Sequence, residues 1–186
     1  TAAGALLPHI KKDTRVAISA ASSSVGMAAM ATCRARGALP IALTTHVQEK
    51  RDTLLAAGAH AVLDIRASDL AQQLKQIDVA FCAVSGPVIN SYAKALRPGG
   101  RIIQYGLLDA SPWTPHVGLM IGKHITLEYF NLIQLLEDQE RLAKTIAFIQ
   151  THIGKELPIH IHQTFPLNEL AHAMDVMEAN RHVGKI

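Results

Sequence analysis

Aromatic side chains are scarce in this sequence, at 4% of its 186 residues, and charged side chains make up only 18%. The formal net charge is +3 and the basic residues are scattered, so the composition argues against a nucleic-acid-binding surface. No apolar run approaches the ~18 residues that a membrane span requires. Only two cysteines are present, Cys33 and Cys82, and they do not form a C-x-x-C pair. We therefore expect reduced core thiols in a cytoplasmic protein with no nucleic-acid and no membrane partner.

The abundant residues are Ala, Leu, Ile and Val, which suit helices packed on a buried parallel sheet. Strand-like and helix-like segments alternate from Arg15 to Gly106, a pattern that indicates parallel strands with right-handed crossovers. The expected strands here are 15–19, 39–44, 61–65, 78–84 and 101–105, and the expected helices are 25–36, 47–57, 69–76 and 87–96. The fold class is therefore α/β, a Rossmann-type doubly wound parallel six-stranded sheet with helices on both faces.

The alternation of strands and helices stops after Gly106, where a loop-rich stretch leads to the expected sixth strand, His124–Phe130. A long helix follows, and we expect it to break near Asp138. The turn Pro98-Gly99-Gly100 is expected to precede the fifth strand. The remaining expected elements are a helix over 1–12, the long helix over 132–153, a strand over 157–165 and an amphipathic helix over 168–180.

The most informative stretch is a turn of small residues, Ser19 to Ser24, between the first strand and a helix that stops at Gly37. We call residues 19–24 the serine turn. A strand, a tight turn and a helix let the backbone approach a phosphate group, because the first amides of a helix lack internal partners. Only the last glycine of the fingerprint G-x-G-x-x-G is present, Gly26, and with Ala20 and Ser23 the pattern reads A-x-x-S-x-x-G. An ordinary strand–turn–helix unit with Ser23 or Ser24 as N-cap is the alternative interpretation.

The end of the second strand indicates which dinucleotide would bind. An acidic residue there binds the ribose 2′-hydroxyl of NAD(H), but this strand ends in Thr44-Thr45-His46. Lys50 and Arg51 follow at the start of the next helix. Hydroxyl groups and a cation suit a 2′-phosphate, so NADP(H) is favoured over NAD(H). The alternative is that Lys50 and Arg51 belong to a solvated helix face.

Several stretches, in order and over nearly the whole chain, resemble the nucleotide-binding half of the medium-chain dehydrogenase/reductase superfamily. The resemblance is to its zinc-independent, quinone oxidoreductase-like branch. No single motif is specific, but their order is. The stretches are Thr1–Leu6, Ala20–Gly26, Lys50 with its neighbours, Ala57–His60, Leu96–Gly106, Phe165–Ala173 and Gly184–Ile186.

The resemblance implies a role for each part of a bound NADP(H) molecule. Serines and a valine would face the pyrophosphate, polar residues would surround the 2′-phosphate, and apolar residues would flank the adenine and the nicotinamide. The implied cofactor-binding residues are Ser22, Ser23, Ser24, Val25, Thr44, Thr45, His46, Lys50, Ile65, Val84, Ser85, Tyr105, Gly106, Leu107, Phe130 and Leu132. It also implies a homodimer through the edge strand His124–Phe130.

The chain departs from the superfamily pattern at the turn. Glycine is common where Ser23, Ser24 and Ser85 stand, and near relatives often carry Arg at the position of His46. A neutral histidine binds a 2′-phosphate less well than arginine, which predicts a modest NADPH affinity.

The resemblance implies that much of the enzyme lies outside this sequence. An amino-terminal barrel-like (GroES-like) catalytic domain supplies most substrate contacts in this superfamily. We therefore expect a fragment in which residues 1–156 form the NADP(H)-binding domain and residues 157–186 return to the catalytic domain. No catalytic residue is assigned. Tyr105 could be a general acid, but its position at the end of a strand favours a packing role.

The resemblance implies an oxidoreductase that transfers hydride from NADPH to a quinone or an α,β-unsaturated carbonyl substrate. A non-catalytic dinucleotide-binding or dimerisation module of a larger protein is the main alternative. A methyltransferase is disfavoured, because that class has an acid at the end of the second strand. A metal site at His152, His160 and His162 is also disfavoured, since no convergent set of ligands with supporting hydrogen bonds is evident.

Overall fold

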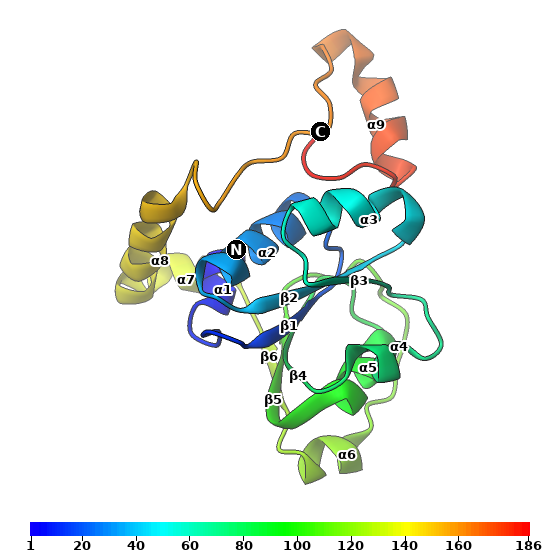
Figure 1. Ribbon diagram of the computed structural model, residues 1–186, viewed down its shortest axis with the longest axis vertical. Coiled ribbons are helices and arrows are strands. Elements are labelled where there is room, and N and C mark those ends of the chain that lie inside the picture. Colours follow the sequence, from blue (N-terminus) through cyan, green and yellow to red (C-terminus); the bar gives the residue numbers. More distant parts are fainter.

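The computed structural model describes residues 1–186 and contains a six-stranded, all-parallel sheet (Figure 1). The strand order is β3-β2-β1-β4-β5-β6, which is a doubly wound order with its switch point between β1 and β4. The fold class predicted from the sequence is therefore confirmed. The strands are β1 (Arg15–Ile18), β2 (Leu39–Thr44), β3 (Ala61–Asp64), β4 (Ile77–Cys82), β5 (Leu96–Gln104) and β6 (Thr126–Tyr129).

Helices cover both faces of the sheet because the side chains of each strand alternate between them. Val16 and Ile18 pack with α1 and α2 on one face, while Ala17 packs with α4 and α5 on the other. Cys33 is buried in the first of these layers and Cys82 in the second. The helices are α1 (Ala2–Leu6), α2 (Ser24–Ala35), α3 (Val47–Ala56), α4 (Leu70–Leu74), α5 (Val88–Ala95), α6 (Val117–Gly122), α7 (Leu132–Glu137), α8 (Gln139–His152) and α9 (Leu170–Glu178), with a short 3-10 turn, η1 (Leu167–Glu169).

The switch point is held by a buried serine at the carboxyl end of β1. The hydroxyl of Ser19 accepts a hydrogen bond from the backbone N–H of Ala83 at 2.7 Å and lies 3.5 Å from the carbonyl oxygen of Phe81. This contact joins β1 to β4 beyond the last residues of their ladder. The strands diverge after it, and a crevice opens where ligands bind in doubly wound sheets.

Several expected elements differ in the structure. The segment 157–165 forms only isolated bridges rather than a strand, because it has no neighbouring strand to complete its hydrogen bonds. The turn expected at Pro98-Gly99-Gly100 lies within β5, next to a register shift in the pairing of β4 and β5. The first helix ends at Leu6, just before Pro8, whose ring disfavours a longer helix. The break expected near Asp138 is confirmed, since its side chain caps α8.

The carboxyl-terminal part of the chain leaves the sheet after α8 and returns to it at the end (Figure 1). Apolar side chains are exposed along this excursion, among them Ile159 at 76% and Leu167 at 86%. The last residues return to the body of the fold, where Val183 is buried in the same core layer as α2. None of the helices is long and apolar enough to cross a bilayer.

Candidate functional site

The serine turn makes its tight bend without a glycine at Ala20 or Ser23. Ala20 has a φ of +48°, in the left-handed region that normally favours glycine. The hydroxyl of Ser23 accepts a hydrogen bond from the backbone N–H of Gly26 at 3.1 Å, so Ser23 is the N-cap of α2. A Cβ on Gly26 would lie 2.6 Å from Cα and 2.7 Å from the carbonyl oxygen of Ala21, so the close packing of helix and strand requires this glycine.

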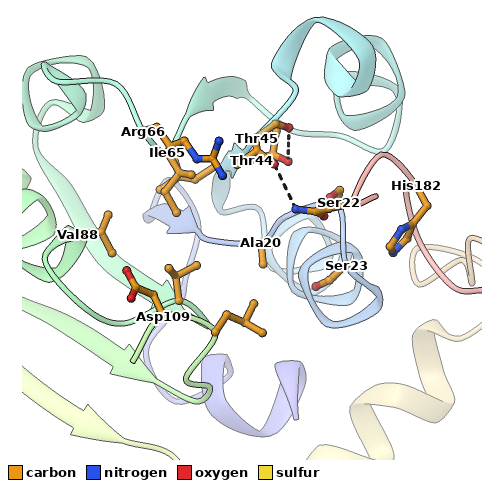
Figure 2. A pocket seen from close by; sticks show the side chains of 14 residues that line it. Ala20, Ser22, Ser23, Thr44, Thr45, Ile65, Arg66, Val88, Asp109 and His182 are labelled. Carbon is orange, nitrogen blue, oxygen red and sulfur yellow. Dashed lines mark hydrogen bonds between the residues drawn. The ribbon is translucent and has the colours of Figure 1, made fainter. Parts of the chain in front are cut away.

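A cavity of about 500 Å³ opens in front of this turn, at the carboxyl ends of β1 to β4 (Figure 2). It collects side chains from both sides of the switch point, as ligand sites in such sheets do. Of the residues predicted from the sequence, those lining it are Ser22, Ser23, Thr44, Thr45, Ile65 and Val84. The lining residues that the sequence reasoning missed are Ala20, Leu43, Arg66, Val88, Leu108, Asp109, Asn180 and His182.

A second cavity, of about 380 Å³, lies at the carboxyl ends of β5 and β6. The consecutive residues Val84 and Ser85 line the first and the second cavity, and so do Leu108 and Leu107. The two cavities are therefore neighbours along one edge of the sheet. The residues lining the second cavity are Ser85, Gln104, Tyr105, Gly106, Leu107, Tyr129 and Phe130.

The remaining predicted residues line neither cavity. Ser24 and Val25 begin α2, His46 precedes α3 with an exposed side chain, and Leu132 begins α7. Lys50 is fully buried. Its ammonium group donates hydrogen bonds to neutral acceptors, and burial lowers its pKa.

The cation at the mouth of the first cavity is Arg66. Its exposed side chain follows directly after β3, and Figure 2 shows the guanidinium directed toward the end of β2 at Thr44 and Thr45. Arg51 instead donates to the carbonyl oxygen of Val62 at 3.3 Å and does not line the cavity. Arg66 could have been found from the sequence, because the carboxyl ends of parallel strands share one edge of the sheet.

The side chain of Tyr105 is packed into the sheet layer at the second cavity. Its ring stacks on Phe81 with 4.0 Å between the ring centroids, and its hydroxyl is buried without a hydrogen-bond partner. Burial raises the pKa of Tyr105 well above its ordinary value. A phenol held in this way supports the shape of the cavity and gives up its proton only at strongly alkaline pH.

A family model for zinc-binding dehydrogenases matches residues 57–186. The chain belongs to the zinc-binding dehydrogenase family. Despite the family's name, the residues present do not fit a zinc ion. No group of three or more His, Cys, Asp or Glu side chains converges in the structure, and the cysteines lie in opposite core layers.

This family member is similar to parts of much longer proteins. It is 29% identical to the mycocerosic acid synthase-like polyketide synthase of Mycobacterium tuberculosis, in an alignment of 188 positions that covers 97% of this chain and 9% of that protein. It is 26% identical to the JamJ enoyl reductase, with a TM-score of 0.75, over 94% of this chain and 54% of that one. The chain thus spans less than a tenth of that curated relative.

The fold itself is shared with the quinone oxidoreductase from Thermus thermophilus, a protein also solved in complex with NADPH. The TM-score is 0.85 at 24% identity, over 99% of this chain and 60% of that one. This likeness shows that the fold predicted from the sequence is shared.

Proposed function

We propose that this chain is the NADP(H)-binding domain of an oxidoreductase that transfers hydride from NADPH to a quinone or an α,β-unsaturated carbonyl substrate. The observation that carries the proposal is the pair of neighbouring cavities along the carboxyl edge of the sheet, with the serine turn at the first of them. A bound NADPH would supply the hydride from its nicotinamide ring. The residues of this chain bind and orient it.

Each part of the cofactor has a matching region. The pyrophosphate would lie against Ser22, Ser23 and the first turn of α2, where backbone N–H groups and the helix dipole favour an anion. Ile65 would flank the adenine. The second cavity, with Tyr105 and Phe130, would hold the nicotinamide.

The polar end of β2 favours NADPH over NADH. Thr44 and Thr45 line the cavity at the end of β2, a position where no acid is present to repel a 2′-phosphate, and Arg66 faces them from the end of β3. A guanidinium can pair with phosphate oxygens through two hydrogen bonds. We therefore assign the recognition of the 2′-phosphate to Arg66 together with the two threonines.

Titration of the 186-residue chain with NADPH, followed by nicotinamide fluorescence, tests the cofactor. Binding that is tighter for NADPH than for NADH is the expected result. No binding of either cofactor at millimolar concentration would overturn the proposed function.

Replacing Arg66 with alanine is expected to raise the Kd for NADPH about tenfold or more, because a hydrogen-bonded charge pair with the 2′-phosphate is lost. The Kd for NADH should stay the same, since NADH lacks that phosphate. Arg51→Ala is the matched control and should change neither Kd. An equal loss for both cofactors in Arg66→Ala would contradict this assignment.

Chemistry would need groups beyond those in this chain, since the hydroxyl of Tyr105 at the nicotinamide end is buried and its ring is stacked. We therefore place the substrate contacts in a catalytic domain outside residues 1–156. The exposed apolar groove around Phe165, Leu170 and Met174 would face that domain, with residues 157–186 returning to it. Comparing enoyl and quinone reduction by the chain alone and by its parent polypeptide tests this division.

A homodimer through β6 belongs to the same proposal. This strand is at the edge of the sheet and Tyr129 is 72% exposed, so its backbone is free to pair with a second copy. Sedimentation of the 20.1 kDa chain should give the mass of a dimer. A monomer at micromolar concentration would exclude this contact for the chain by itself.

A further inference from the structure

The last residues of the chain cross the mouth of the first cavity. We call residues Asn180–Gly184 the C-terminal strap. At one end the side-chain amide of Asn180 donates to the hydroxyl of Thr45 at 3.3 Å. At the other end the backbone N–H of Gly184 donates to the carbonyl oxygen of Ser22 at 2.7 Å. The strap therefore joins the end of β2 to the serine turn and forms one wall of the cavity.

A buried lysine holds the strap in place. The ammonium group of Lys50 donates to the carbonyl oxygen of Asn180 at 2.6 Å and to the hydroxyl of Ser22 at 3.0 Å. No carboxylate pairs with it, since the acid beside it in sequence, Glu49, lies 3.8 Å from Arg181 instead. A buried cation with only neutral acceptors is unusual, and an anion in the adjoining cavity would supply the missing negative charge.

His182 is the strap residue that faces this cavity. Figure 2 shows its ring beside Ser22 and Ser23, and it lines the cavity with them. Its Nδ1 atom is buried and has no hydrogen-bond partner in the protein. Buried polar atoms are nearly always paired, so an unpaired one at a cavity wall points to a partner supplied by a ligand.

The surroundings of His182 suit an anion. Burial is the largest cause that lowers its pKa, and the charges of Lys50 and His162 lower it further, while the nearby backbone of Val176 raises it. The net shift is downward, so the ring is neutral at pH 7 and carries one N–H. Arg66 and Asp109 are the charged residues that line the cavity with it. Only Asp109 would oppose an anion, and it belongs to the segment that follows β5 rather than to the serine turn or the strap.

Resting on the proposed function, we infer that His182 is a cofactor-binding residue whose Nδ1–H donates to a phosphate oxygen of the bound dinucleotide. Two groups of the dinucleotide carry phosphate oxygens that can accept this hydrogen bond, the pyrophosphate and the 2′-phosphate. The strap is thereby part of the binding site, and the cofactor connects it to the serine turn.

Two substitutions of His182 separate donation from packing. Asparagine places an amide nitrogen where Nδ1 lies, whereas phenylalanine keeps the ring and removes the donor. His182→Phe is expected to raise the Kd for NADPH about tenfold, the loss of one hydrogen bond to a charged group, and His182→Asn should recover most of it. His60→Phe, at an exposed histidine away from the cavity, is the matched control and should bind as the wild type does.

Measuring both cofactors identifies the phosphate. An equal loss for NADPH and NADH in His182→Phe supports donation to the pyrophosphate, and a loss for NADPH alone supports donation to the 2′-phosphate. A His182→Phe variant that binds both cofactors like the wild type overturns the inference. So does a His182→Asn variant that binds as poorly as His182→Phe, because the side chain would then only fill space.

A measurement on the unsubstituted chain keeps the test independent of folding defects. The ring nitrogen resonances of His182 should shift on saturation with NADPH, while those of His60 should not. Saturation with NADPH that leaves the His182 resonances unchanged overturns the inference but not the proposed function. A wild-type chain that binds neither cofactor overturns both.

Discussion

Replacing Gly26 with alanine is expected to abolish measurable NADPH binding and to lower the free energy of unfolding by about 3 kcal/mol. The added Cβ would meet the carbonyl oxygen of Ala20 and the backbone of Ala21, with Cα of Ala21 only 2.6 Å away. Neither backbone atom can move without displacing the serine turn from the start of α2. Thermal unfolding should shift down by roughly 6–12 °C for a chain of this size.

Gly118→Ala is the control for this experiment. A Cβ on Gly118 meets nothing within 4 Å, and the residue lies in α6, far from the turn. Alanine in a helix is about 1 kcal/mol more favourable than glycine, so stability should stay the same or rise, with unchanged NADPH binding. A Gly26→Ala variant as stable as Gly118→Ala would show that the turn does not depend on this close approach.

Replacing Lys50 with glutamate is expected to have the second largest effect. The new carboxylate would be buried against the carbonyl oxygen of Asn180 and the hydroxyl of Ser22, where the ammonium now donates. A buried charge without a partner costs about 3–5 kcal/mol, so unfolding should begin roughly 10 °C lower. Binding of NADPH and of NADH should both be lost, because the strap is released from the serine turn.

Lys11→Glu makes the same change of charge at an exposed lysine and should leave stability within about 0.5 kcal/mol of the wild type. Thermal unfolding and cofactor titration of both variants distinguish two roles for Lys50. If Lys50→Glu unfolds like Lys11→Glu and weakens only NADPH, then Lys50 is a 2′-phosphate ligand, as the sequence resemblance implies. A loss of stability with both cofactors affected identifies it as the residue that holds the strap.

The sequence was sufficient to predict the parallel sheet and the position of the first cavity. Strands of a buried parallel sheet are continuous apolar runs, and Val16 to Ile18 or Val79 to Cys82 show this pattern locally. The serine turn was also visible, since its small residues and Gly26 are neighbours in sequence. Local patterns of this kind need no knowledge of distant contacts, so the amino-acid sequence is enough to place these elements.

Other expectations were wrong because tertiary contacts decide them. The stretch 157–165 alternates like a strand, yet no neighbouring strand is available to complete its ladder. Pro98-Gly99-Gly100 has the composition of a turn, but it lies inside β5 as an irregularity: Leu96 pairs with Ile77 and Arg101 with Val79, and Gly99 between them has a φ of +76°. Pairing partners, rather than local propensity, determine whether such segments form strands.

Some residues that line the first cavity can be predicted from the sequence, and others are brought there only by tertiary contacts. Thr44 and Thr45 lie at the end of β2, and Ser22 and Ser23 lie in the turn that follows β1, so the amino-acid sequence alone determined that they meet at one edge of the sheet. Asn180 and His182 come to that edge only in the tertiary structure. The hydrogen bond from Lys50 to Asn180 spans 130 residues, and no local pattern encodes a contact between a buried ammonium and a carbonyl so far along the chain. That contact depends on the fold returning its last residues, anchored by buried Val183, to the turn where the first strand ends.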